Sequence, residues 1–379
     1  MLLFFVGNIF VAAGQTSIGD VINRYAKVVS ISENSVQVAT NNQAALFSRG
    51  DTILLIQMKG VVLNSSDLDY GGIYSQPNGA IGLHEFLIIE SISGTQITFM
   101  SPLVHYGNAQ QYDNFNPDAF VQIIRTPSYP SAIVTGKIEA TPWDSINGYG
   151  GVVSFFAGKS LELRNNIDVS GQGFAGAPAV ASVGVAITTT NSAAFDGFSY
   201  GNHGLPSDTS GLKGEGIGYL LHINGSNKPI SPNYSKGKAP NYSGGGGGNG
   251  AFSGGGGGSN GGAGGIGAQE KVFGYPYSGG VGGKTIPSNL QSSLPSSNVR
   301  LYLGGGGGGS TFRGQGHGVN AGNGGGIIII VCDSIIGNGH RIMSNGATPS
   351  DVASGEGGAG GGGAGGSIAI YTSAFADSR

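Results

Sequence analysis

The sequence predicts an all-β protein with little α-helix. We expect a small N-terminal β-barrel or β-sandwich, followed by a β-sandwich in which glycine-rich segments pack as polyglycine II-like helices. Three observations predict this fold class. Short apolar runs separated by Gly, Asn and Pro fill residues 15 to about 140. Two internal repeats recur along the chain, and glycine supplies 75 of the 379 residues, about 20 % against ~7 % in an average protein.

The chain begins with an apolar run, Met1 to Gly14, that ends in small residues. It is too short to span a bilayer, which takes ~20 residues, and it is typical of the core of a signal peptide. We therefore expect residues 1–14 to be a signal peptide that is removed on export, so that the mature chain begins at Gln15. A hydrophobic first strand is the alternative interpretation.

Residues 15–142 form the first expected domain, the β-barrel or β-sandwich. Val29–Val38 and Glu90–Phe99 match without gaps at an offset of 61 residues. Each reads as a strand, a two-residue turn and a second strand, so the pair predicts duplicated hairpins. A buried strand is expected to end at Met58 after a Gly-Asp turn, and another at Phe120–Arg125.

Residues 143–379 form the second expected domain, which is rich in glycine and carries an insertion at 172–303. A second repeat, at an offset of 175 residues, organises this domain. In each copy a pair of glycines precedes an apolar strand, and in the first two copies a polar turn returns a second strand. The copies are Gly150–Ala157 with Ile167–Gly171, Gly325–Cys332 with Ile342–Gly346, and Gly365–Tyr371, which starts a third copy.

The glycine tracts at 244–267, 304–326 and 355–366 run directly into apolar strands. Disordered linkers and a parallel β-helix are alternatives, but buried glycine backbone needs hydrogen-bond partners. Extended helices with three residues per turn meet that need by bonding sideways, because the lack of Cβ lets their backbones approach. Residues 304–309 would span about 19 Å at ~3.1 Å per residue, close to a typical strand of ~17–20 Å. We expect a packed bundle in which Gly306 is structural.

Composition and motifs exclude several classes of function. A net charge of -3, from 18 basic and 21 acidic residues, argues against nucleic-acid binding. The single Cys332 cannot form an intramolecular disulfide, and the six histidines lack the spacing of a zinc-binding pair. Ser278–Thr285 is one substitution from a P-loop, but no buried strand precedes it and no helix follows. We expect no catalytic site, cofactor or metal. Asp67 and Asp69 leave a calcium site open, with a solvated turn as the favoured interpretation.

Two groups of residues stand out in the insertion. Lys213 and Glu215 place opposite charges two residues apart among glycines, which predicts a local or cross-segment ion pair that fixes the loop; ligand binding is the alternative. Tyrosines also cluster in the insertion, where they are expected either to contact a sugar or protein or to cover the glycine bundle. The contact candidates are Tyr200, Tyr219, Tyr234 and Tyr275.

Four segments together resemble the N-terminal region of large Bacteroidetes surface proteins, the gliding-motility-associated adhesins exported by the type IX secretion system. These segments are Ile53–Gly60, Lys213–Ile217, Lys238–Pro240 before Gly244, and Gly322–Ile330. The glycine tracts beside β-strands are also similar to the glycine-rich extracellular domain of the anaplastic lymphoma kinase receptor. The resemblance implies a polyglycine-helix bundle joined to a β-sandwich, and export to the outer cell surface.

Three functions fit these observations. We favour a non-catalytic adhesion or display module, secreted or on the outer cell surface. It would contact a glycan, another surface protein or an extracellular surface through loops of the glycine-rich domain, and the secretion machinery during export. A structural cap of a surface filament is the second. A carbohydrate-active enzyme is the third, and it would need two carboxylates about 5–10 Å apart.

Overall fold

The structure is a computed structural model. It describes residues 14–62, 80–106, 115, 120–181, 199–200, 210–219, 235–250, 252–269, 278–286, 299–312, 318–349 and 357–376. Within these ranges the protein is all-β apart from one short helix, α1 (Asn41–Ala44), which confirms the predicted fold class. No helix in the described ranges is long and apolar enough to cross a membrane. The expectations for residues 1–13, Asp67, Asp69, Tyr234 and Tyr275 lie outside the described residues.

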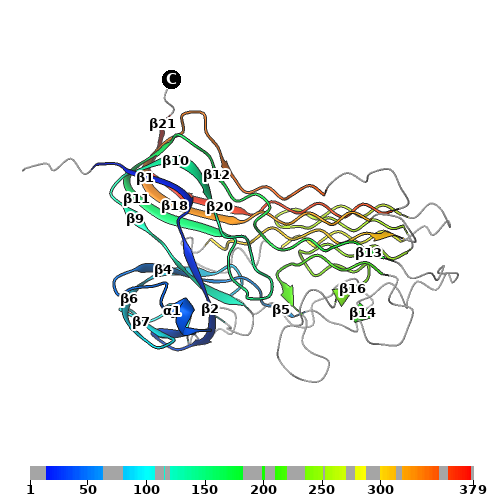
Figure 1. Cartoon of the computed structure of the whole chain (residues 1–379), viewed down its shortest axis with the longest axis horizontal. Helices are drawn as coiled ribbons and strands as arrows, with labels where there is room; N and C mark the ends of the chain where they lie inside the picture. Colours follow the sequence, from blue (N-terminus) through cyan, green and yellow to red (C-terminus); the bar gives the residue numbers. More distant parts are fainter. Residues whose placement is uncertain are drawn as a thin grey trace, which may run out of the picture.

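The first unit is a closed, mainly antiparallel barrel, drawn at the lower left of Figure 1. Its two hairpins are the halves of the 61-residue repeat, and their second strands also pair with each other. Alternate side chains of each strand point into an apolar core, as the sequence pattern predicts. In barrel order, the strands are β2 (Arg24–Ile31), β3 (Ser35–Val38), β7 (Gln96–Phe99), β6 (His84–Ser93), β4 (Thr52–Gln57) and β8 (Val121–Arg125).

The second unit contains a nine-stranded sheet in which every pair is parallel. Successive segments of chain lie on one another in layers, and copies of the 175-residue repeat pair in register, as in Val152 with Ile327. The layers are β1 (Thr16–Val21), then β9 (Ser128–Tyr129) with β10 (Ala132–Glu139), β11 (Val152–Leu163) with β12 (Ile167–Asp168), β18 (Ile327–Ile336) with β19 (Ile342–Met343), and β20 (Ser367–Tyr371) with β21 (Ala374–Ala376).

Two features of this sheet differ from the sequence expectations. The second strand of each repeat does not return along the first: β12 and β19 pair with each other, because Ile167 and Ile342 turn onto a second face and close an apolar core. The barrel is also smaller than the expected unit 15–142. Its strands span 24–125, whereas β1, β9 and β10 on either side belong to the parallel sheet.

The glycine tracts form a bundle that extends away from the sheet to the right in Figure 1. Residues 304–309 lie at its centre. The N–H and C=O groups of successive residues bond to different neighbouring segments, and residues three apart bond to the same segment. This is the pattern of an extended helix that has three residues per turn and forms its hydrogen bonds to neighbouring helices. The six neighbours, in order around the centre, are 174–177, 212–215, 245–248, 256–259, 361–364 and 322–325, and each also bonds to the next. The packing is therefore hexagonal.

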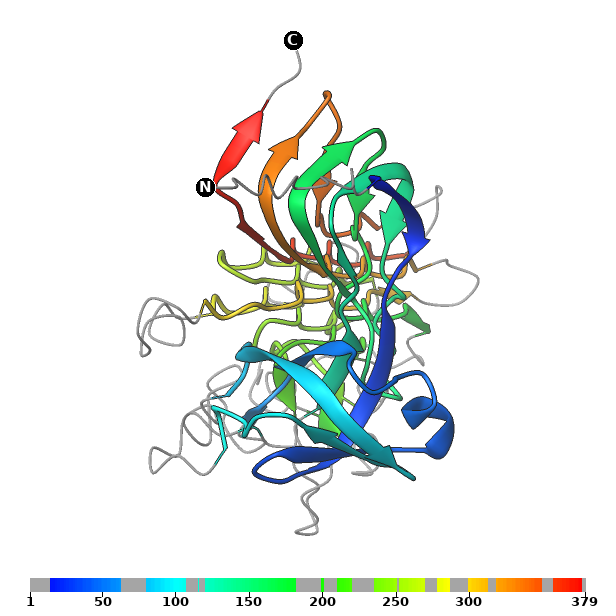
Figure 2. The ribbon, with the colours of Figure 1, turned by 90° about the vertical axis from the view of Figure 1, so that its left-hand side faces the viewer.

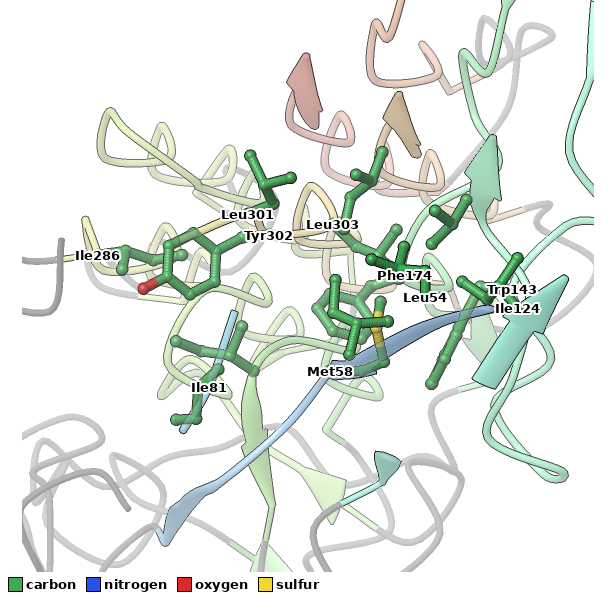
Figure 3. Close-up of a cluster of buried hydrophobic side chains, with 14 of the residues drawn as sticks. Leu54, Met58, Ile81, Ile124, Trp143, Phe174, Ile286, Leu301, Tyr302 and Leu303 are labelled. Carbon is green, nitrogen blue, oxygen red and sulfur yellow. The ribbon is translucent and has the colours of Figure 1, made fainter. Parts of the chain in front are cut away.

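The barrel, the sheet and the bundle meet at one apolar cluster, shown in Figure 3. Leu54 and Met58 of the barrel face Phe174 and Leu303, which belong to the bundle end. Buried amide side chains also join the barrel to β11. Asn23 donates to the Ser154 carbonyl (2.6 Å) and accepts from its N–H (3.1 Å). These contacts join the parts, whose ribbon Figure 2 shows from the side.

Three short strand pairs complete the described structure. All of them involve the insertion 172–303, which they join to the barrel, to itself and to the chain beyond it. The pairs are β5 (Val61–Val62) with β15 (Gly218–Tyr219), β14 (Ser199–Tyr200) with β16 (Ser235–Lys236), and β13 (Val180–Ala181) with β17 (Thr311–Phe312).

Candidate functional site

Glu215 lies on the 212–215 helix, where it joins the barrel to the bundle. Its carboxylate forms an ion pair with Lys59, accepts from the Trp143 indole N–H (2.9 Å) and accepts from the Ala175 N–H (3.1 Å). Only 1 % of the Glu215 side chain is exposed. The Lys59 ammonium also lies 5.3 Å from the centre of the Phe174 ring. The cross-segment ion pair expected for this residue is therefore formed with the barrel.

Lys213 is buried two residues before Glu215 and does not pair with it. Its ammonium donates to the Ala239 carbonyl, and burial holds the pKa of Lys213 well below its ordinary value. Both residues therefore serve the packing of the bundle rather than an open site. Gly306 lies at the bundle centre, where an added Cβ would overlap Ala175.

The other motifs from the sequence are placed as follows. Tyr200 lies on β14 and Tyr219 on β15, and only their backbone is described, so their proposed contact role stays a prediction. The P-loop-like segment contains residues 280–283, which form a bundle helix bonded to 254–257. It opens no α-helix, and it offers no phosphate loop. In the described part of the chain, no group of three His, Cys, Asp or Glu side chains could hold a metal ion.

A cleft of about 340 Å³ lies where barrel strand β6 meets the parallel sheet. The barrel contributes His84, Glu85 and Phe86, and the sheet contributes Phe156 from β11, Val331 from β18 and Tyr371 from β20. The Phe86 and Phe156 rings meet edge to face with their centroids 5.0 Å apart, which closes the apolar part of the cleft. Tyr371 is 41 % exposed and supplies an accessible ring at its border.

The polar groups of this cleft are only partly satisfied. Glu85 Oε2 accepts from the Val104 N–H at 2.9 Å, whereas Oε1 is buried and has no partner among the described residues. Burial raises the pKa of Glu85, and hydrogen bonds from Val104 and His105 oppose the rise. His84 Nδ1 is likewise buried without a partner in the described part of the chain. Burial lowers the pKa of His84, so its ring is neutral at pH 7.

These groups give the cleft a definite binding chemistry. A carboxylate oxygen and a neutral imidazole nitrogen can accept hydrogen bonds, and Tyr371 can pack against a flat apolar surface. A larger groove of about 690 Å³ continues over the sheet; it shares Phe156, Val331 and Tyr371 with the cleft and adds Asp333. The sequence analysis missed this site, because its residues come from four strands that only the folded chain brings together.

Comparisons with known proteins place few limits on the function. No family model matches the chain, and no curated protein matches it. Among solved structures, the chain is similar to the tailspike protein gp49 from Pseudomonas phage LKA1, with 16 % sequence identity and a TM-score of 0.18. The similarity covers 40 % of this chain and 23 % of the tailspike chain. The functional argument therefore rests on the geometry of this chain.

Proposed function

We propose that this protein is a non-catalytic adhesion or display module, secreted or held at the outer cell surface, that contacts a glycan or another surface protein. The observation that carries the proposal is the rigid bundle. The insertion 172–303 supplies four of the six helices around residues 304–309: 174–177, 212–215, 245–248 and 256–259. The segments between these helices therefore start and end on a fixed frame, which is the arrangement in which binding residues commonly collect.

The cleft beside β6 supports the same proposal from a second part of the molecule. It combines an exposed aromatic ring, Tyr371, with the hydrogen-bond acceptors Glu85 and His84. Sugars offer hydroxyl donors and apolar ring faces, so this combination suits a neutral glycan. Glu85 is the one carboxylate among the described residues of the cleft, and Asp333 lies in the adjoining groove. Because a glycosidase needs two carboxylates that face each other across one cleft, we favour binding over glycoside hydrolysis.

The edge of the parallel sheet favours a structural cap as the second candidate function. Strands β20 and β21 form this edge in the described structure, and they expose Ile368 (43 %) and Phe375 (70 %). An exposed apolar strand edge is suited to pairing with a further strand. A filament subunit could continue the stack at this position. The adhesion and cap functions are compatible if the bundle projects from the filament.

Binding to a glycan array and adsorption to cells would test the adhesion proposal. The parent protein should be compared with Tyr371→Ala and Glu85→Gln in the cleft, and with a variant in which Tyr200, Tyr219, Tyr234 and Tyr275 are changed to Ala. Loss of binding in either set would assign the contact surface. Equal binding by the parent and all the variants would reject both surfaces, and turnover of a glycan by the parent would reject the non-catalytic proposal.

A further inference from the structure

One position in the hexagonal packing of the bundle is occupied by no residue that the structure describes. The central helix 304–309 has six neighbours, whereas the helix 254–259 bonds to five in the described structure. The five are 243–246, 265–268, 280–283, 305–308 and 359–362. The sixth position lies between 265–268 and 359–362, at the surface. A groove of about 480 Å³ occupies it, lined by backbone and by the small or apolar side chains of these three helices.

The floor of this groove presents unused hydrogen-bond acceptors. Residues three apart in the helix 254–259 point in the same direction and form a row, so the helix has three rows. The N–H groups of all three rows bond to neighbouring helices, and so do the carbonyls of two rows. The third row consists of Gly255 and Gly258. Among the residues that the structure describes, no backbone N–H donates to either carbonyl. Because rows repeat every third residue at 120° intervals, this row faces the empty position.

The two walls present donors by the same argument. On the 263–268 helix, Gly264 and Gly267 donate to residues 283 and 280, and the next row of amides, Gly265 and Ala268, turns toward the groove. On the other wall, residues 361 and 364 donate to the central helix and residues 363 and 366 to the 344–347 segment. The remaining row there is Ala359 and Gly362, which also faces the groove.

The protein itself fills one end of this empty column with a side chain. Asn260 follows Gly257 by one helical turn, and its amide nitrogen reaches across the groove to the Gly365 carbonyl at 3.0 Å. A Cβ on Gly257 would lie 3.3 Å from Gly265 N and 3.7 Å from Gly362 O, between the two walls. The Asn260 side chain therefore occupies one end of the groove, and the groove is open beside Gly257.

We propose that this groove binds an extended glycine-rich segment of another polypeptide, in a helix with three residues per turn and glycine at two of every three positions. Such a helix has alternating rows of donors and acceptors, so one row of its N–H groups can reach the floor while two rows of carbonyls reach the walls. In the central helix an added Cβ points at a neighbour that donates to that helix, as Gly304 does at Ala364 and Gly306 at Ala175. Both walls of the groove donate, so the residue that donates to the floor and the residue before it direct their Cβ atoms at the walls, where only glycine fits. The third position faces outward and accepts other residues, including proline.

The groove sets the length and chemistry of this ligand. From Gly254 to Asn260 the floor offers six steps, or about 19 Å at ~3.1 Å per residue. The described residues that line the groove carry no charged side chain, so binding should change little with salt concentration. Recognition of the backbone, rather than of side chains, would let the site accept many sequences that keep the glycine spacing. This inference is independent of the glycan contacts proposed above.

A peptide-binding experiment tests the inference. The probe is a fluorescent twelve-residue peptide of repeating Gly-Gly-Pro, and its control is repeating Ala-Ala-Pro. We expect the first peptide to bind the full chain with 1:1 stoichiometry and the second to bind about tenfold more weakly or worse, because its methyl groups overpack the groove walls. Amide exchange should slow at Gly265, Ala268, Ala359 and Gly362 when the first peptide is bound.

Two variants locate the site. Gly257→Val places a side chain in the groove and should weaken binding by about tenfold or more. The matched control is Gly261→Val, where an added Cβ meets nothing within 4 Å, and it should bind like the parent. If Gly257→Val does not fold, Gly257→Ala replaces it. Equal binding of both peptides, no binding, unchanged binding by the Gly257 variant, or occupation of the groove by a second copy of the chain would each overturn the inference.

Discussion

The centre of the bundle can be tested by adding one methyl group, in the variant Gly306→Ala. The new Cβ would overlap the carbonyl oxygen and carbon of Ala175 and lie 2.7 Å from Gly176 N. Carbon atoms approach polar backbone atoms no closer than about 3.3 Å. The 174–177 helix must therefore move by at least roughly 0.6 Å away from the central helix, and by more at Ala175.

The magnitude follows from the hydrogen bonds that this movement strains. Phe174 N donates to the Gly304 carbonyl at 3.2 Å, and Ala177 N donates to the Gly307 carbonyl at 3.0 Å. A buried donor or acceptor left without a partner costs about 1–3 kcal/mol, and overpacking alone costs about 1–3 kcal/mol. We expect Gly306→Ala to lower the free energy of unfolding by about 2–6 kcal/mol. That is a large part of the ~5–15 kcal/mol that stabilises a typical domain.

Urea unfolding of Gly306→Ala beside the matched variant Gly261→Ala measures this effect. Gly261 has nothing within 4 Å of its added Cβ, so that variant should be neutral or gain about 0.4–1 kcal/mol from the stiffer unfolded chain. Amide exchange at residues 304–309 should speed up only in the Gly306 variant. Equal stabilities for the two variants, with unchanged exchange, would show that the central tract tolerates side chains and would refute hexagonal packing.

Three further predictions follow from buried polar groups. Glu215→Gln should cost about 3–5 kcal/mol in urea unfolding, because it leaves the Lys59 ammonium buried without its carboxylate; Glu139→Gln, in an exposed ion pair, should cost about 0–1 kcal/mol, and equal costs would contradict this. Because the pKa of His84 is lowered in the folded state, its stabilising contribution is present above pH ~6.5 and is lost as the pH falls toward the folded value. Unfolding measured from pH 7.5 to 5 should show this loss in the parent and not in His84→Gln. Burial raises the pKa of Tyr302 to about 12, so its stabilising contribution is lost between about pH 10 and 12. Absorbance at 295 nm should show one fewer late-titrating phenol in Tyr302→Phe, and identical titrations would count against burial.

The sequence predicts those parts of the fold that depend on local pattern. The two hairpins of the 61-residue repeat are formed as expected, because a two-residue turn with flanking alternation specifies a hairpin over a short stretch of chain. The 175-residue repeat predicts matching strands, but not that β11 and β18 lie in register side by side. Their parallel pairing depends on where the intervening bundle returns the chain, and this is a property of the whole fold.

The cleft beside β6 and the Lys59–Glu215 ion pair between the barrel and the bundle could not be predicted for the same reason. Glu85 faces Tyr371 only because the barrel packs against the far end of the sheet. Lys59 meets Glu215 across 156 residues of sequence, and their spacing gives no sign of it. The sequence does mark Glu215 as unusual, since a charge among glycines in a charge-poor region needs a partner, but it does not identify which lysine supplies one.

The spacing of glycine along each tract depends on how many neighbouring helices surround that tract in the bundle. In the central helix all six residues, 304–309, are glycine, because an added Cβ would overlap backbone at every position. The surface helix 263–268 keeps glycine where it faces inward, at Gly264 and Gly267, and carries Ile266 on its outer side, where it is 74 % exposed. A helix with three residues per turn therefore needs glycine at one position in three for each neighbour that donates to it, and a fully surrounded helix needs it at all three. The helix 279–283 has two such neighbours, and Val281 is its one residue that is not glycine. A partner that entered the empty surface position would also meet two donating helices, so the same rule gives it glycine at two residues in three.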